Sequence, residues 1–296
     1  MSQPPVDADT RSRRPKVIYV MGAGRSGSTI LGVILGNCGD VFFAGELDKW
    51  LARSGVPKLK DTPRVEFWAG VRARVADRDE LFGGQAHRYL ERSSALFRGG
   101  RRRARRRLRA PYLRAMSELY ESVAASASAA YVVDTSHYPL RARELQSLAD
   151  VDLYILLLVR DPAAVVASFA KDDVAERQFN PATTRAYLLL TYLLSAWVFL
   201  SQPRERRLLL HYEDLLEDPV SVLREVLDHV GSSAEPPDLS ALRTGVALHG
   251  NRLLEADVVS LQRPAVTPAK ERWAGRLFAR AMLGGLDRLH PRITPR

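Results

Sequence analysis

The segment Lys16–Leu31, KVIYVMGAGRSGSTIL, constrains the fold of this chain more than any other part of the sequence. A short apolar run over 17–21 leads into a glycine-rich turn, and an apolar helical pattern follows over 30–35. Such a strand–loop–helix unit directs backbone N–H groups and the start of a helix at one point, where an anion can bind. The segment therefore predicts a loop that binds phosphate or sulfate.

The loop departs from the pattern of nucleotide-hydrolysing P-loops in one position. The frame G-x-x-x-x-G-[KR]-[ST] nearly fits from Gly22 to Thr29, but Ser28 stands where a basic residue belongs. The only cation within the loop is Arg25. Because the lysine of a P-loop holds the β- and γ-phosphates, its absence indicates a different anionic ligand.

Composition is typical of a globular protein with a sizeable core, since 46% of the 296 residues are hydrophobic. The single cysteine, Cys38, excludes an internal disulfide framework and is consistent with a reducing, cytoplasmic location. Residues 1–15 are polar and proline-rich, which predicts a disordered tail before one domain over 16–296. The uncharged stretch 186–200 is shorter than the ~20 residues of a membrane-spanning helix, so we expect a buried core helix there.

The positive charge is concentrated in one segment. Eight arginines lie within Arg98–Arg109, and without them the net charge of +10 falls to +2. Such a run can contact nucleic acid, an anionic membrane or an acidic substrate, or it can be a solvated surface. No aromatic residues are interleaved with the arginines, as stacking on single-stranded nucleic acid would require, so we expect no specific nucleic-acid partner.

Strand and helix patterns alternate along the chain. Apolar runs predict strands at 17–21, 131–134, 153–159 and 208–211, and helical patterns occupy 29–36, 65–76, 111–129, 139–149, 162–170, 183–200 and 219–230. The alternation predicts an α/β fold, an open parallel sheet flanked by helices. The stretch of about 50–129 has no convincing strand and is expected to be a helical insertion after the first core unit.

In such sheets ligands bind beyond the carboxyl ends of the strands. Arg160 directly follows the third predicted strand, and Ser168 lies about two helical turns later. Together they could hold a second phosphate, the arginine by a forked contact and the serine by its hydroxyl. Alternatively, Arg160 forms a surface pair with Asp161, and Ser168 packs in its helix.

Two residues are candidate general bases. His137 follows the second predicted strand in a loop, and an imidazole there could accept a proton near neutral pH. Glu46 follows a glycine behind the apolar run 42–44 and is the second candidate. The alternatives are an ordinary loop histidine and a cap for a helix that begins at Leu47.

These segments together resemble sulfotransferases that use 3′-phosphoadenosine 5′-phosphosulfate (PAPS), in particular a bacterial branch whose first loop reads G-x-G-R-S-G-S-T. The resemblance implies that the 5′-phosphosulfate is held by Gly24, Arg25, Ser26, Gly27, Ser28 and Thr29. It assigns the 3′-phosphate to Arg160 and Ser168, and the catalytic role to His137 or Glu46 together with Arg25. Many eukaryotic members carry a lysine at the position of Arg25.

Two later segments extend the resemblance. Residues 210–219, LHYEDLLEDP, are similar to the family's strand and turn before a late helix, and 249–252, HGNR, resemble the segment that closes over the 3′-phosphate. The second similarity implies that Asn251 and Arg252 contact the co-substrate.

The resemblance implies in-line transfer of a sulfuryl group from PAPS, without a metal, to a hydroxyl or amine of a small-molecule, glycan or lipid acceptor. One alternative is a P-loop kinase or NTPase, in which Asp134 at a strand end would hold Mg²⁺. Another is a non-catalytic binder of nucleic acid or membrane that uses Arg98–Arg109. In the sulfotransferase the same run could contact an anionic membrane or an acidic substrate.

Overall fold

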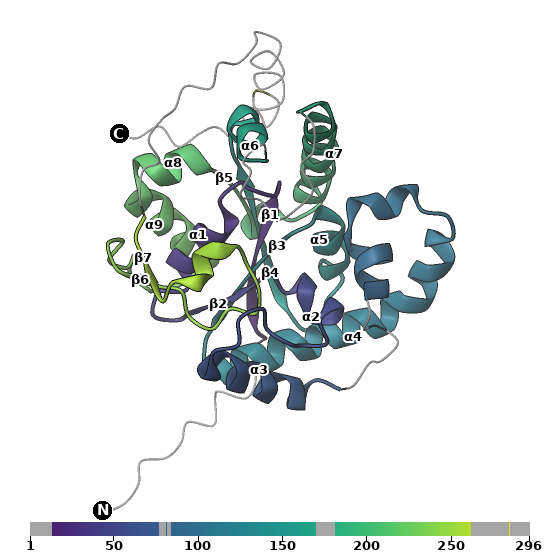
Figure 1. The fold of residues 1–296 in the computed structure, drawn as a ribbon, viewed down its shortest axis with the longest axis horizontal. Helices are drawn as coiled ribbons and strands as arrows, with labels where there is room; N and C mark the ends of the chain where they lie inside the picture. The colour runs from purple at the N-terminus through teal and green to yellow at the C-terminus, as the bar shows by residue number, and fades with distance from the viewer. Residues whose placement is uncertain (1–13, 77–80, 82–83, 170–180, 262–283, 285–296) are drawn as a thin grey trace, which may run out of the picture.

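The computed structural model describes residues 14–76, 81, 84–169, 181–261 and 284. Its centre is a five-stranded sheet in the order β2-β3-β1-β4-β5, in which every neighbouring pair is parallel (Figure 1). The strands are β1 (Lys16–Gly22), β2 (Val41–Gly45), β3 (Tyr131–His137), β4 (Asp152–Val159) and β5 (Arg207–His211). A small antiparallel pair, β6 (Leu242–Arg243) and β7 (Val258–Val259), lies apart from it. The predicted α/β fold with a parallel sheet is confirmed.

Helices cover both faces of the sheet (Figure 1). The α-helices are α1 (Ser28–Leu35), α2 (Asp48–Ala52), α3 (Thr62–Arg74), α4 (Arg101–Ala127), α5 (Pro139–Leu145), α6 (Pro162–Phe169), α7 (Pro181–Leu200), α8 (Tyr212–Glu217) and α9 (Pro219–Val230). Short 3-10 or π turns are η3 (His87–Glu91), η4 (Ser93–Phe97), η5 (Arg204–Arg206) and η6 (Arg252–Glu255). Between β2 and β3 the described residues form α2, α3, α4, η3, η4 and the turns that connect them.

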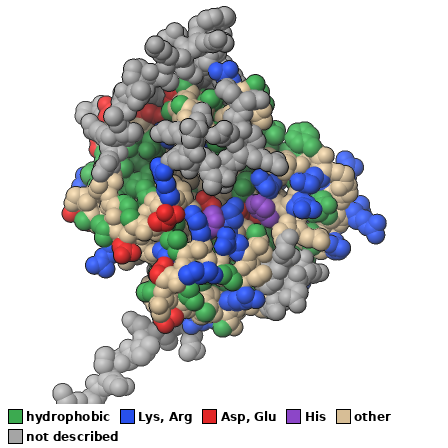
Figure 2. All heavy atoms as spheres, in the orientation of Figure 1, with side chains coloured by type: hydrophobic (Ala, Val, Ile, Leu, Met, Phe, Trp, Pro, Cys, Tyr) green, Lys and Arg blue, Asp and Glu red, His purple; other side chains and the backbone are tan. Residues whose placement is uncertain are grey.

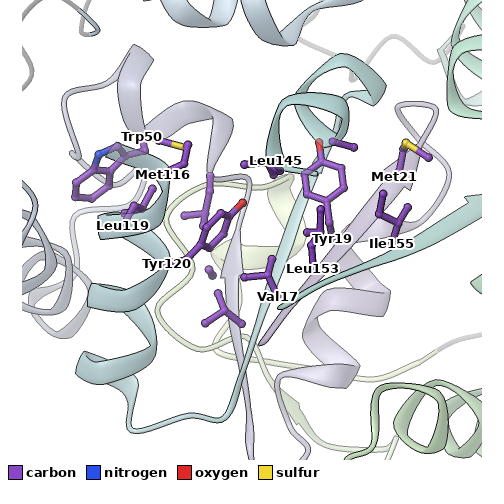
Figure 3. Packing of buried hydrophobic residues seen from close by; sticks show 14 of the residues in the cluster. Val17, Tyr19, Met21, Trp50, Met116, Leu119, Tyr120, Leu145, Leu153 and Ile155 are labelled. Carbon is purple, nitrogen blue, oxygen red and sulfur yellow. The ribbon is translucent and has the colours of Figure 1, made fainter. Parts of the chain in front are cut away.

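Alternation along β1 explains why the sheet is covered on both sides. Val17, Tyr19 and Met21 pack on one face with residues such as Tyr120 and Leu145, as Figure 3 shows. Ile18 and Val20 pack on the opposite face with α1 and α9. Successive residues of a strand point to opposite faces, so a strand buried on both sides is apolar at nearly every position.

Two strand predictions need correction. The edge strand β2 was not among the predicted strands, because five residues that include a glycine give too short a pattern to separate strand from loop. The second predicted strand was ended at residue 134, but β3 continues to His137. Polar Thr135 and Ser136 suggested a loop, yet both are buried within the strand.

The arginine-rich segment is helical. The helix predicted to begin at Pro111 begins instead at Arg101, so the run forms the first turns of α4 and Pro111 lies inside the helix. Arginine is a good helix former, whereas the proline removes one backbone hydrogen bond. Packing supports the early turns, because Glu144 of α5 accepts hydrogen bonds from Arg105 at 2.6 Å and Arg109 at 2.7 Å.

The helix expected to be a buried core helix, α7, is buried on one face only. Leu188, Tyr192, Ser195 and Phe199 are buried, whereas leucines and a tryptophan on the other face are exposed. By length and hydropathy its segment Ala182–Leu200 could cross a membrane, although a core helix of a soluble protein passes the same test. Of the predicted tail, residues 1–13 lie outside the described part of the chain, and the carbonyl of Pro15 already accepts a hydrogen bond from Asp152 at 3.0 Å.

Candidate functional site

The loop between β1 and α1 has the geometry of an anion-binding turn. Arg25 and Gly27 both adopt positive φ angles, 68° and 95°. A Cβ atom at Gly27 would lie 2.3 Å from the ring of Tyr212, so a glycine is required there for space as well as conformation. The first N–H groups of α1, which begins at Ser28, have no partners within the helix and are free to face an anion.

Arg25, Arg160 and Ser168 meet at this loop. Nε of Arg25 donates a hydrogen bond to Oγ of Ser168 at 3.1 Å. Arg160, which follows β4, donates to the carbonyl oxygen of Arg25 at 3.0 Å. The structure thus brings the two predicted anion-binding groups into one site. Arg160 does not simply pair with Asp161 on the surface, as the alternative interpretation would have it.

Aromatic side chains fix the position of Arg160. Its guanidinium lies over the ring of Tyr212, 4.6 Å from the centroid. The hydroxyl of Tyr192 on α7 donates a hydrogen bond to the backbone carbonyl of Arg160 at 3.2 Å. The Arg160 guanidinium is held between the Tyr212 ring and the carbonyl oxygen of Arg25 in the loop. It is therefore already oriented toward a ligand that binds at the loop.

Glu46 lies at the end of β2 against the segment that contains His249. The Gly45 backbone, with φ of 83°, allows this approach, because a Cβ there would be 2.4 Å from the carbonyl oxygen of His249. Glu46 Oε2 is 2.9 Å from His249 Nδ1. Burial by itself would raise the pKa of Glu46, but the hydrogen bond from His249 and the charges nearby lower the pKa to about 2. Glu46 is therefore ionised and a weak base.

His137 ends β3 in a left-handed backbone conformation, with φ of 55°. Burial lowers the pKa of His137, and the carboxylates of Glu46 and Asp48 only partly offset this effect. Its ring packs against Tyr138, with 4.3 Å between centroids. The imidazole is consequently neutral at neutral pH and has a nitrogen free of protons.

Beneath His137, Asp134 belongs to a buried network of charges. It accepts hydrogen bonds from Arg141 at 3.0 Å and from the hydroxyl of Tyr120 at 2.7 Å. Arg141 also contacts Glu91, and all three charged side chains are fully buried. The Asp134 carboxylate is thus paired with the Arg141 guanidinium, so its oxygens are not open to a Mg²⁺ ion. Within the described residues no group of three or more His, Cys, Asp or Glu side chains is placed to hold a metal.

A family model described as the sulfotransferase family matches residues 15–236. The chain belongs to this family. Among solved structures, the sulfotransferase domain of the Synechococcus PCC 7002 olefin synthase is similar, with a TM-score of 0.55 and 18% identity over 92% of this chain and 96% of that one. The sulfotransferase domain of the curacin biosynthetic pathway has a TM-score of 0.52 and 17% identity over 93% and 99%. No curated protein sequence matches. At these identities the structures support the fold.

The late segment of this sulfotransferase family member runs beside the β1–α1 loop. A Cβ at Gly250 would lie 3.6 Å from the methyl group of Thr29, so 249–250 run beside the start of α1. Asn251 Oδ1 accepts a hydrogen bond from the N–H of Leu253 at 2.9 Å, which caps η6, and Arg252 is exposed. Contacts of Asn251 and Arg252 with a co-substrate stay predictions.

Three further residues, which sequence reasoning did not single out, shape the site. His249 pairs with Glu46, Tyr212 covers Gly27, and the hydroxyl of Tyr187 accepts a hydrogen bond from the N–H of Gly24 at 3.0 Å. His249 had a signal because it begins the HGNR segment, and Tyr212 lies within the LHYEDLLEDP segment, whereas Tyr187 lies on α7 without any motif. Figure 2 shows histidine side chains beside Lys, Arg, Asp and Glu near the centre of the viewed face.

Proposed function

We propose that this sulfotransferase uses PAPS as the sulfuryl donor and transfers the group to a hydroxyl or amine of a small-molecule, glycan or lipid acceptor. The observation that carries the proposal is the contact of Arg25 with both Ser168 and Arg160. It joins a helix N-terminus that suits a phosphosulfate to an arginine–serine pair that suits a second phosphate. PAPS carries both groups on one nucleotide.

The loop residues supply electrostatic stabilisation. The acceptor oxygen forms a bond to sulfur while the bond from sulfur to the 5′-phosphate oxygen breaks, and 3′,5′-adenosine bisphosphate leaves with the electron pair. Negative charge grows on the departing phosphate. The N–H groups at the start of α1, the hydroxyls of Ser28 and Thr29, and the Arg25 guanidinium are the donors that stabilise it.

His137 serves as the general base in this proposal. Its lowered pKa keeps the imidazole neutral, so it can take the proton of the acceptor hydroxyl. Glu46, with a pKa of about 2, is too weak a base for that task. Its negative charge instead stabilises the imidazolium that forms on His137, and the hydrogen bond from His249 holds the carboxylate in place.

The kinase alternative is less well supported by the same residues. It needs a cation where Ser28 stands and an aspartate that is open to Mg²⁺, whereas Asp134 is bound by Arg141. These two residues therefore favour sulfuryl transfer over a kinase reaction.

Incubation of the full chain with sulfur-labelled PAPS in EDTA tests the proposal. A panel of phenol, sugar and sterol acceptors is added, and both labelled product and 3′,5′-adenosine bisphosphate are measured. We expect the two to appear together, in equal amounts, without added metal. PAPS left intact with every acceptor, together with phosphate transfer in a parallel incubation with ATP and Mg²⁺, would contradict the proposal.

A further inference from the structure

Helix α7 exposes a line of large apolar side chains. Leu189, Leu193 and Trp197 are 43%, 62% and 52% exposed, and Leu200 continues the line at the end of the helix. Their spacing of four, four and three residues places them along one side of the helix. Single exposed apolar residues are ordinary, but a contiguous row indicates a surface that contacts something other than water.

The turn η4 adds to this apolar surface. It packs against α7. Phe97, its last residue, is 76% exposed, and Leu96 beside it is also exposed. An exposed phenylalanine is costly in water, and because η4 contacts α7, Phe97 and Leu96 add apolar area beside that helix.

The exposed arginines of α4 follow directly in the chain. Arg105 and Arg109 turn toward α5, where both pair with the single carboxylate of Glu144 at 2.6 and 2.7 Å. Arg102, Arg103 and Arg106 are exposed instead. Because these three are spaced by three and four residues, they share the outer side of the helix.

Helix α5 connects the apolar row with the arginines. Its Arg143 lies over the ring of Trp197 on α7, 5.4 Å from the centroid, while the next residue, Glu144, binds Arg105 and Arg109 on α4. Helices α7 and α4 therefore flank α5, as Figure 1 shows. In Figure 2 hydrophobic side chains lie beside Lys and Arg at the right-hand edge, over η4 and the start of α4.

We propose that this α7–α4 face, formed by the exposed residues of α7, η4 and the first turns of α4, binds the surface of an anionic lipid bilayer. The apolar side chains enter the interface, and the arginines contact the headgroup phosphates. We infer an anionic bilayer from charge complementarity. The exposed arginines complement its negative headgroups, and the exposed apolar side chains beside them can enter its apolar interior. Nucleic acid would leave Leu189 and Leu193 without a partner. The inference goes beyond the proposed catalysis and does not depend on it.

Helix α7 lies on the bilayer in this arrangement and does not cross it. Its inner side, with Leu188, Tyr192 and Phe199, is already buried against the protein core. Extracting that side into lipid would break contacts that hold Arg160, because the Tyr192 hydroxyl donates to the Arg160 carbonyl. Only the outer row is available to the interface.

Sedimentation of the full chain with vesicles tests this proposal. We expect the protein to pellet with vesicles of phosphatidylcholine and phosphatidylserine, to be released by high salt, and to stay in solution with phosphatidylcholine alone. The triple variant Arg102→Gln, Arg103→Gln, Arg106→Gln should lower the partition coefficient on the order of 100-fold. The double variant Leu193→Ser, Phe97→Ser should also lower the partition coefficient, and this reduction should not depend on the salt concentration.

A matched control replaces three exposed arginines on other elements, Arg204→Gln, Arg224→Gln and Arg243→Gln. It should pellet nearly as well as the unaltered chain, and all variants should keep the far-UV circular dichroism spectrum and the unfolding midpoint of the unaltered chain, which shows that they are folded. Three results would overturn the proposal. The first is equal binding of the protein to both vesicle types. The second is a control triple variant whose partition coefficient falls as much as that of the Arg102, Arg103 and Arg106 variant. The third is a soluble dimer that dissociates in the Leu193→Ser variant.

Discussion

Nε of Arg25 donates a hydrogen bond of 3.1 Å to Oγ of Ser168, although 143 residues separate them in the chain. The bond is possible because β1 and β4 are neighbours in the sheet, so the loop after β1 and the helix after β4 begin at the same edge. Two anion-binding groups that are separate in the sequence are therefore one site in the fold.

Arg160→Ala should weaken the binding of 3′,5′-adenosine bisphosphate roughly 10- to 100-fold, because a charged hydrogen-bond donor to a phosphate is lost. Arg25→Ala should abolish transfer, since it removes the cation at the leaving phosphate. Arg204→Ala, at an exposed arginine of η5, is the control and should change neither quantity. Calorimetric titration with the bisphosphate and turnover assays of the three proteins test both expectations. Unaltered binding and turnover in Arg160→Ala and Arg25→Ala would refute the assignment of these two residues to the co-substrate site.

His137→Ala should reduce turnover about 100- to 10,000-fold and leave bisphosphate binding nearly intact, as expected for loss of a general base. In the unaltered protein the pKa of His137 lies below its usual 6.5, so kcat/KM should rise with pH through a midpoint below 6.5 and then level off. The pH profile measures this midpoint. A normal rate in His137→Ala would refute the base role of His137.

Glu46→Gln should lower the free energy of unfolding near pH 7 by about 3 kcal/mol, because the folded protein holds the pKa of Glu46 at about 2. A depressed carboxyl pKa stabilises the fold above the unfolded value of 4.5, and the stabilisation is lost as pH falls from 4.5 toward 2. The difference between the two proteins should therefore shrink over this range in urea unfolding. Glu66→Gln, at an exposed position of α3, is the control. If the free energy of unfolding changed with pH in the same way in Glu46→Gln and in the unaltered protein, a lowered pKa of Glu46 would be contradicted.

Arg141→Leu should destabilise the fold by about 3–5 kcal/mol, because it leaves the buried carboxylates of Asp134 and Glu91 without their cation. Arg143→Leu, two residues along α5 and exposed, should cost far less. Denaturant unfolding of both variants gives the comparison. Equal losses would mean that the buried network contributes little to stability.

The parts of this account that were predictable from the sequence depend on neighbouring residues. The loop from Gly22 to Thr29 carries its strand, turn and helix start within one short segment. Arg160 could be placed because it follows a long apolar strand, and a parallel sheet directs such strand ends to one edge.

The remaining features depend on contacts between distant segments. β2 is a strand because β3 pairs with it, and its five residues alone do not settle this. β3 continues beyond Asp134 to His137, and Arg141 and Tyr120 satisfy the charge of Asp134 in the core. The start of α4 at Arg101 requires Glu144, 39 residues beyond Arg105. The role of His249 follows from its contact with Glu46, 203 residues away.

The central claim, that the joined anion sites bind PAPS, is tested most directly by calorimetric titration of the full chain with 3′,5′-adenosine bisphosphate, ADP and ATP in EDTA. We predict tight binding of the bisphosphate and much weaker binding of the other two, because only the bisphosphate places a phosphate on both Arg160 and the β1–α1 loop. Equal affinity for all three nucleotides, or ATP binding that appears only with Mg²⁺, would contradict it.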